Sequence, residues 1–355
     1  MGENMLEQMT DLQALVRGGF TDWEQFGNVR AVHKDGLVLF NYTRAAQFEG
    51  RWNWFERVSR GLILNAETGE VVARPFDKFW NWGERDRTSD ARLVSVTEKL
   101  DGSLGVLYRT GCLEQFAIAT RGSFDSEQAQ WASEELAVGY DIEDLPDSFT
   151  LLFEIIYPDN RIVVDYEGAE GLYLLAVRDR FTGKYLYWRD VYDLAREYGF
   201  PVPKVHQFDS VEDIIAAKQE LDGNAEGWVA EFSDGQRFKF KGARYMEIHR
   251  IVHAASFKRV LEAVAAGTYD ETMTAVPDEL LDEIREWKAH IDEVVTSTIE
   301  RVEAGYAIAP RDDRKTFALW ARANALELAP YLFRRLDGQD YTGLIYKLAF
   351  RDAPD

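Results

Sequence analysis

The sequence predicts an α+β protein in which antiparallel sheets occupy about the first two thirds of the chain and helices alone occupy the rest. The 355 residues suffice for about two domains, and 46% of them are hydrophobic, which is enough apolar surface to offset the entropy of ordering. Short extended segments separated by turn residues dominate as far as Gly242, and apolar residues at helical spacing dominate after it. We therefore expect a first domain at residues 1–243 and an all-α domain at residues 244–355.

Hairpin signals predict the antiparallel pairing of the first domain. Residues 28–33 and 37–42 flank the turn Lys34-Asp35-Gly36, and the same pattern recurs around Ala66-Glu67-Thr68-Gly69 and around Arg109-Thr110-Gly111. The strands expected along this domain are residues 28–33, 37–42, 61–65, 70–74, 94–97, 104–108, 113–119, 150–157, 171–177, 227–232 and 236–241.

Helical periodicity predicts three helices between the later strands and three more in the second domain. The helices expected in the first domain are residues 126–138, 188–198 and 211–221. Those expected in the second are residues 245–265, 278–302 and 311–328, with few strand signals among them.

The charge balance argues against two broad classes of protein. There are 41 Lys and Arg and 62 Asp and Glu, so the formal net charge is 41 − 62 = −21. A general nucleic-acid coat and a membrane-surface protein both depend on broad positive potential, which this chain lacks. Local basic sites are compatible with the balance.

Cysteine use and the N-terminal sequence indicate the compartment. The single cysteine, Cys112, cannot close an intramolecular disulfide or build a thiolate metal cluster, which fits a reducing compartment. Residues 1–20 lack a basic start followed by an apolar stretch, and no run of about 18 uncharged apolar residues occurs. We expect a cytoplasmic monomer with no membrane partner.

The sharpest local feature is Glu98-Lys99-Leu100-Asp101-Gly102, which places a lysine where a β-branched stretch ends. An amine attacks phosphorus only when it is neutral. Because an unperturbed lysine has a pKa of about 10.4, a nucleophilic lysine needs burial, nearby cations or a metal. Taken alone, K-x-D-G is a weak pattern, and the alternative is an ordinary turn with an exposed lysine.

A cluster of cations near residue 240 could meet that requirement. In Arg237-Phe238-Lys239-Phe240-Lys241 the period of a strand places the two phenylalanines on one face and the three cations on the other. One interpretation is a half-buried strand with solvated cations. The other is a clamp for polyphosphate, which would also ease the loss of a proton from a neighbouring amine.

Two carboxylates stand out near apolar strands. Glu154 interrupts Leu151-Leu152-Phe153-Glu154-Ile155-Ile156-Tyr157, and burying it unpaired would cost several kcal/mol. It either has an Arg or Lys partner in the core or accepts hydrogen bonds from ligand hydroxyls, with Phe153 offering a ring for stacking. Glu226, just before Gly227, is either a solvated turn residue or an oxygen ligand for magnesium.

Three further cations follow or precede expected strands. Arg60 lies in Ser59-Arg60-Gly61 and Arg121 in Thr120-Arg121-Gly122, while Lys78 lies among aromatics in Phe76-Asp77-Lys78-Phe79-Trp80-Asn81. Each is either a phosphate contact or a plain surface cation.

Taken in order, these motifs resemble the motif series of covalent nucleotidyltransferases. The series is Arg60-Gly61, Lys78, Lys99-Leu100-Asp101-Gly102, Glu154, Glu226-Gly227 and Lys239-Phe240-Lys241, and it spans most of residues 50–245. Within that superfamily the chain resembles the RNA ligase 1 family of tailed phages, because of the Ser-Arg-Gly strand, the Asp-Lys-Phe-Trp-Asn segment and the helical C-terminal domain. DNA ligases and capping enzymes usually carry an arginine two residues after the motif glycine, where this chain has Leu104.

The resemblance implies both a fold and an activity. The fold is a nucleotidyltransferase (ATP-grasp-like ligase) domain followed by a helical domain that confers RNA specificity. The activity is ATP-dependent joining of RNA 5′-phosphate and 3′-hydroxyl ends with Mg²⁺ or Mn²⁺, through a lysyl-AMP and an adenylylated RNA 5′ end. The implied role is RNA repair, with broken tRNA as one substrate.

The resemblance also implies roles for single residues. Lys99 would attack the α-phosphate of ATP, Glu226 would bind the metal, and Lys239 and Lys241 would contact the α-phosphate; Asp101 completes the catalytic set. Glu154 would hold the ribose, with Phe153 stacking on adenine. The remaining nucleotide contacts would be Arg60, Lys78, Glu98, Leu100, Gly102 and Arg121.

Two alternatives stay open at this point. The first is another covalent nucleotidyltransferase, a DNA ligase or a capping enzyme, which nucleotide choice would distinguish. The second is a non-catalytic RNA-binding relative. To reconcile the acidity with RNA binding, we expect positive potential only in a cleft lined by Arg60, Lys78, Lys99, Arg237, Lys239 and Lys241.

Overall fold

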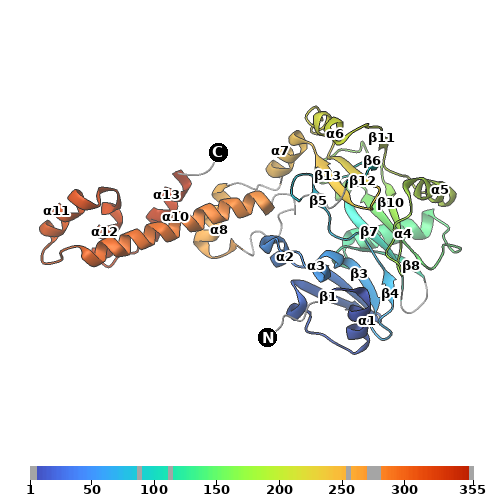
Figure 1. Cartoon of the computed structure of the whole chain (residues 1–355), viewed down its shortest axis with the longest axis horizontal. Helices are drawn as coiled ribbons and strands as arrows, with labels where there is room; N and C mark the ends of the chain where they lie inside the picture. The colour runs from blue at the N-terminus through green and yellow to red at the C-terminus, as the bar shows by residue number, and fades with distance from the viewer. Residues whose placement is uncertain (1–5, 86–89, 111–114, 253–256, 270–280, 352–355) are drawn as a thin grey trace. The chain divides into compact units, whose positions relative to one another are not determined.

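The computed structural model describes residues 6–85, 90–110, 115–252, 257–269 and 281–351, and the chain divides into two compact units, Met1–His249 and Arg250–Asp355. The division falls within helix α7 (Ala243–Val252), which begins where the sequence places the domain boundary (Figure 1). That the two units are separate folding domains stays a prediction. Cys112 and parts of the expected segments 113–119, 245–265 and 278–302 lie outside the described residues.

The first unit has the predicted α+β class and contains three sheets. One has the order β1-β2-β3-β4, with all its pairs antiparallel. Its strands are β1 (Val29–Lys34), β2 (Leu37–Tyr42), β3 (Arg60–Asn65) and β4 (Val71–Ala73). The predicted first hairpin is confirmed, since Asp35 and Gly36 at its turn both have positive φ, 48° and 76°.

The second and third sheets carry the motif residues. The order β10-β9-β7-β8 is antiparallel throughout. Its strands are β7 (Ser103–Arg109), β8 (Phe116–Thr120), β9 (Phe149–Ile156) and β10 (Gly171–Asp179). The third sheet has the order β11-β6-β12-β13-β5. Its strands are β5 (Trp80–Asn81), β6 (Leu93–Glu98), β11 (Val205–His206), β12 (Gly227–Phe232) and β13 (Arg237–Lys241).

Two short strands were not predicted from the sequence, and one of them departs from antiparallel pairing. β5 pairs with β13 in parallel, at Phe238 with Trp80 and Lys239 with Asn81. Strands of two residues, such as β5 and β11, are too short for an alternating pattern to reveal.

All three helices predicted in the first unit are present. α5 (Trp188–Tyr198) has the predicted bounds, and α4 (Glu127–Gly139) begins after Ser126, whose hydroxyl accepts a hydrogen bond from the Ala129 N–H. α6 (Val211–Ala217) ends earlier than predicted. The helices α1 (Met9–Arg17), α2 (Arg44–Glu49) and α3 (Trp54–Val58) were missed. Helices α4 and α5 lie against the β10-β9-β7-β8 sheet and share its core (Figure 1).

The second unit is helical, as predicted. Its described α-helices are α8 (Phe257–Ala266), α10 (Leu281–Ile308), α11 (Arg314–Asn324), α12 (Ala329–Leu336) and α13 (Thr342–Arg351). Val302, Phe317, Leu332 and Ile345 form part of its core. The predicted helix 311–328 is α11 followed by a 3₁₀ turn, and α12 and α13 were missed.

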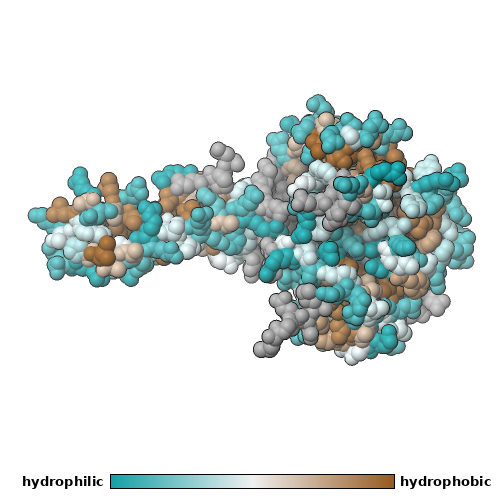
Figure 2. All heavy atoms as spheres, in the orientation of Figure 1, coloured by the Kyte–Doolittle hydropathy of each residue, from teal (hydrophilic) through white to brown (hydrophobic). Residues whose placement is uncertain are grey.

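The surface of the first unit is mainly polar on the face shown in Figure 2, where hydrophobic residues form separate patches. Among the described residues, no helix combines the length and hydropathy needed to cross a membrane.

Candidate active site

Three motif residues meet at one end of the β11-β6-β12-β13-β5 sheet. Lys99 follows β6, Glu226 precedes β12, and Lys241 ends β13. The Lys99 N–H donates to the Gly227 carbonyl at 2.8 Å, and Gly227 is the register partner of Lys241. Gly227 has a φ of 132°, and a Cβ there would lie 1.9 Å from the Phe240 carbonyl oxygen. A glycine is therefore required for this convergence.

The side chains of these residues form a buried cluster with two cations on one carboxylate. Glu226 Oε2 lies 2.6 Å from Lys99 Nζ, and Glu226 Oε1 lies 2.8 Å from Lys241 Nζ. The side chains of Lys99, Lys241 and Glu226 are 18%, 6% and 3% exposed. Two ammonium groups share one carboxylate, so a polyphosphate ligand meets two cations at this point.

The two faces predicted for β13 are confirmed. Phe238 and Phe240 are buried in the core, while Arg237, Lys239 and Lys241 alternate with them on the other face. Lys239 Nζ lies 5.2 Å from the ring centroid of Phe79, within cation–π range. Arg237 is ion-paired with Glu231 at 2.9 Å, so its charge is already countered within the protein.

Glu154 lies beside Lys99 and Glu226 and receives a hydrogen bond from the Gly102 N–H at 3.0 Å. Burial raises the pKa of Glu154 to about 7; Lys99 and the Gly102 N–H oppose this rise, and Glu226 and Asp101 add to it. A carboxyl group of this pKa is partly protonated near neutral pH, so it can both donate to and accept from a ribose hydroxyl.

The raised pKa of Glu154 predicts a pH-dependent stability. Between the ordinary value of 4.5 and about 7 the folded state binds more protons than the unfolded state, so the free energy of unfolding falls as pH rises through this interval. In Glu154→Gln the side chain is neutral at every pH, so the variant should lack this fall in the free energy of unfolding. Urea unfolding of parent and variant across the interval measures the difference. Parallel curves for the two proteins contradict the assignment.

Phe153 requires a correction. Its ring is fully buried, 0% exposed, and it packs at 4.9 Å from the ring of Phe200 in the core of the β10-β9-β7-β8 sheet. Successive strand residues point to opposite faces, so Phe153 points away from the side on which Glu154 meets Gly102. Phe153 therefore has no accessible face for adenine.

The Asp101 carboxylate is buried and accepts three hydrogen bonds, two from the backbone and one from a side chain. Oδ2 accepts from the Val163 and Val164 N–H groups at 2.8 and 2.9 Å, and Oδ1 accepts from the Tyr245 hydroxyl at 2.7 Å. The Asp101 N–H in turn donates to the Tyr166 hydroxyl at 2.7 Å. These bonds position the loop that carries Lys99, and a catalytic role for Asp101 stays a prediction.

Removing this anchor should have a large effect on stability. Asp101→Ala leaves two amide donors and a hydroxyl without their buried partner, and we expect a loss of about 3 kcal/mol in the free energy of unfolding. The matched control is Glu170→Ala, an exposed carboxylate near the same loop, which should change stability by less than about 0.5 kcal/mol. Chemical denaturation compares the two, and equal effects would contradict the anchoring role.

The remaining nucleotide contacts expected from the sequence lie in two places. Around Lys99, the Glu98 N–H donates to the Lys204 carbonyl at 2.7 Å and Leu100 is buried. The other three, Arg60, Lys78 and Arg121, lie beside aromatic rings. Lys78 Nζ lies 4.9 Å from the Trp52 ring and 5.8 Å from the Tyr42 ring, and Arg121 donates to the Tyr42 hydroxyl at 2.8 Å.

Arg60 joins this group through Phe79. Its guanidinium lies 5.9 Å from the Phe79 ring, on which Lys239 also lies. Its Nη1 is buried and has no hydrogen-bond partner among the described residues. A buried donor without a partner costs free energy, and an incoming phosphate oxygen could satisfy it.

The donor set fits a metal ion only together with a nucleotide. Within the described residues, no three His, Cys, Asp or Glu side chains are grouped so as to hold a metal. The carboxylates beside Lys99 are Glu226 and Glu154, whose charges interact. Because Mg²⁺ usually takes one or two protein carboxylates and completes its shell with water and phosphate oxygens, this pair suits a nucleotide-bound Mg²⁺.

Four aromatic residues of the site were missed from the sequence. Tyr166 and Tyr245 hold Asp101, and Tyr42 and Trp52 hold Lys78. Tyr42 ends a predicted strand and Tyr245 begins a predicted helix, but nothing in a single sequence indicates that either faces a functional residue.

Comparison with known proteins gives a family and several relatives. A family model described as RNA ligase matches residues 58–245. A protein of Thermovibrio ammonificans named as a candidate RNA ligase is 32% identical over 208 residues, which cover 55% of this chain and 53% of that protein. The chain therefore spans about half the length of this relative. The RNA ligase of Rhodothermus phage RM378 is 22% identical over 388 aligned residues, covering 87% of this chain and 86% of that protein.

Among solved structures, an archaeal ATP-dependent RNA ligase aligns over 88% of this chain and 94% of its own, with 15% identity and a TM-score of 0.47. A TM-score of this size supports no argument about function.

Proposed function

The chain belongs to the RNA ligase family, whose model it matches over more than half its length, and from this premise we propose that it is an ATP-dependent RNA ligase. The resemblance drawn from the motif series is thereby confirmed at the level of the family. The single observation that carries the proposal is the buried cluster in which Glu226 binds both Lys99 and Lys241. A nucleophilic lysine beside a second cation is the arrangement that adenylyl transfer to an amine needs.

In the first step the Lys99 Nζ, as a neutral amine, attacks the α-phosphorus of ATP. A P–N bond forms, the bond to pyrophosphate breaks, and Nζ loses a proton to give lysyl-AMP. Glu226 Oε2, 2.6 Å from Nζ, holds the lysine in place before attack. Lys241 and Lys239, on one face of β13, stabilise the charge that develops on the α-phosphate oxygens.

In the second step an oxygen of an RNA 5′-phosphate attacks the adenylate phosphorus, the P–N bond breaks, and Lys99 takes up a proton as it leaves. In the third step an RNA 3′-hydroxyl attacks the phosphorus of the RNA 5′-phosphate, loses its proton, and AMP leaves. The ends are then joined by a phosphodiester bond. The substrate class is RNA with 5′-phosphate and 3′-hydroxyl ends.

The other site residues bind the nucleotide. Glu154 holds the ribose and Lys78 helps with the outgoing pyrophosphate. Arg60 holds a phosphate of the nucleotide or RNA, which satisfies its buried Nη1. Glu226 would hold a Mg²⁺ or Mn²⁺ that arrives with ATP; when bound, it neutralises phosphate charge.

The proposal is tested by incubating the protein with Mg²⁺ and nucleotides labelled at the α-phosphate. We expect covalent label from ATP and none from GTP or NAD. The charged protein should then seal a nicked RNA stem-loop in preference to the same nick in DNA. Label from GTP indicates a capping-type enzyme, preference for DNA indicates a DNA ligase, and the absence of any label indicates a non-catalytic relative.

The physiological RNA substrate and the compartment are also part of the proposal. The resemblance supports a repair role on broken RNA, with tRNA cleaved in a loop as the first substrate to assay. A monomeric protein of the cytoplasm fits this role.

A further inference from the structure

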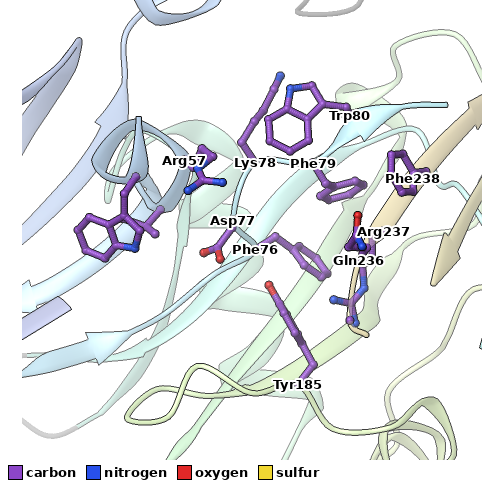
Figure 3. A pocket seen from close by; sticks show the side chains of 13 residues that line it. Arg57, Phe76, Asp77, Lys78, Phe79, Trp80, Tyr185, Gln236, Arg237 and Phe238 are labelled. Carbon is purple, nitrogen blue, oxygen red and sulfur yellow. The ribbon is translucent and has the colours of Figure 1, made fainter. Parts of the chain in front are cut away.

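A cavity of about 240 Å³ lies on the first unit, beside the cluster around Phe79 (Figure 3). Trp54 and Arg57 of α3, the segment from Phe76 to Trp80, Tyr185, and the start of β13 line it. Its lining contains aromatic rings, the cations Arg57 and Lys78, the Arg237 that is paired with Glu231, and the carboxylate Asp77. That carboxylate is bound by Arg178 at 2.8 Å, so the cavity presents no unbalanced negative charge of its own.

Two rings of the cavity, Phe76 and Tyr185, are fixed by stacking on each other and by cations packed on them. Tyr185 stacks on Phe76 with ring centroids 5.7 Å apart and an angle of 23° between the ring planes. Arg178 and Arg237 lie 4.6 and 4.0 Å from the Tyr185 ring, and Arg237 is fixed by its ion pair with Glu231. A preformed aromatic cavity needs little ordering when a ligand binds.

This combination of groups is the chemistry that recognises single-stranded nucleic acid. Bases stack on aromatic side chains without sequence preference, and arginine and lysine bind the phosphates alongside. At about 240 Å³ the cavity is of a size to take one nucleobase.

The cavity is connected to the reacting lysine through a short series of contacts. Phe79 lines the cavity and contacts Lys239, which lies two residues, or about 6.6 Å, before Lys241 on one face of β13. Lys241 shares Glu226 with Lys99. In the second step the RNA 5′-phosphate must approach in line with the P–N bond that breaks, which is the path by which pyrophosphate left. The nucleoside attached to that phosphate then lies on the side from which pyrophosphate left.

We propose that this cavity binds the 5′-terminal nucleoside of the phosphate-bearing RNA strand. The proposal rests on the ligase function above and deepens it. Arg57, exposed at the rim on α3 and shown in Figure 3 on the side of Asp77, contacts the phosphate that follows this nucleoside. Trp54 and Trp80, the half-buried indoles of the lining, hold its base.

The first test replaces Arg57 with Ala, a change at an exposed position that should not affect folding. We expect the KM for 5′-phosphorylated RNA to rise about tenfold relative to the KM for ATP in self-adenylylation, as for loss of one hydrogen bond to a charged group. Arg196→Ala, an exposed arginine of α5 outside the cavity, is the matched control and should leave the ratio unchanged. An equal rise in both KM values would indicate that the cavity binds ATP and would overturn the proposal. Unchanged KM values for both substrates would overturn it as well.

The second test locates the nucleoside directly. The adenylylated protein is irradiated with a 5′-phosphorylated RNA carrying 4-thiouridine as its first nucleotide, and cross-linked peptides are identified by mass spectrometry. Cross-links in the peptides that contain Trp54 or Trp80 support the cavity, and cross-links elsewhere overturn it. If lysyl-AMP never forms, the proposed function fails; if lysyl-AMP forms and RNA is sealed but cross-links fall elsewhere, only this inference fails.

Discussion

Lys99→Ala abolishes the covalent attachment of AMP to the protein. Lys99 Nζ supplies the nitrogen of the P–N bond. We therefore expect the rate of adduct formation to fall by on the order of 10⁶, the loss seen when a nucleophile is removed from another covalent enzyme. The measurement is the amount of label that stays with denatured protein after incubation with ATP labelled at the α-phosphate.

Two controls separate the loss of the nucleophile from a loss of folding. Lys99→Arg keeps a cation for the ion pair with Glu226, but a guanidinium is not deprotonated and forms no adduct. The third step uses no covalent lysine, so Lys99→Ala should still seal RNA that is already adenylylated. Label on Lys99→Ala equal to that on the parent would contradict the assignment.

Glu226→Gln should lower both stability and adduct formation. It leaves the buried ammonium groups of Lys99 and Lys241 facing a neutral amide, and removing one partner of a buried ion pair typically costs about 3–5 kcal/mol. We expect the free energy of unfolding to fall by about that amount, and lysyl-AMP formation to fall at least about 100-fold because Lys99 is no longer held. Glu212→Gln, an exposed carboxylate of α6, is the control and should change neither.

A double variant distinguishes the two effects of Glu226. Combining Glu226→Gln with Lys241→Gln removes one of the two unbalanced charges, so part of the lost stability should return. Adduct formation should stay low, since neither Glu226 nor Lys241 is restored. A double variant no more stable than Glu226→Gln alone would contradict the ion-pair account.

The parts of the site that follow from strand geometry could be predicted from the sequence. The alternation in Arg237-Phe238-Lys239-Phe240-Lys241 correctly placed the two rings in the core and the cations opposite them. The same alternation places Phe153 and Glu154 on opposite faces of β9. The two residues therefore cannot both face the nucleotide, and the buried ring of Phe153 shows which of the two assignments fails.

The parts that depend on tertiary contact could not be predicted. Asp101 was identified as important, but its role depends on Tyr245 and on the Val163 and Val164 amides, which are far from it in the sequence. Nothing in a single chain pairs residues at such separations. The missed helix α12 has a local cause, because Pro330 suggests a break but lies in the first turn, where its missing N–H costs nothing.

The most direct test of the account is to find where AMP becomes attached. The parent protein is incubated with ATP and Mg²⁺, digested, and mapped by mass spectrometry under conditions that preserve the P–N bond. The account predicts one AMP on the peptide that contains Lys99, released when pyrophosphate or 5′-phosphorylated RNA is added. AMP on a different residue, or tight ATP binding with no adduct at all, would contradict it.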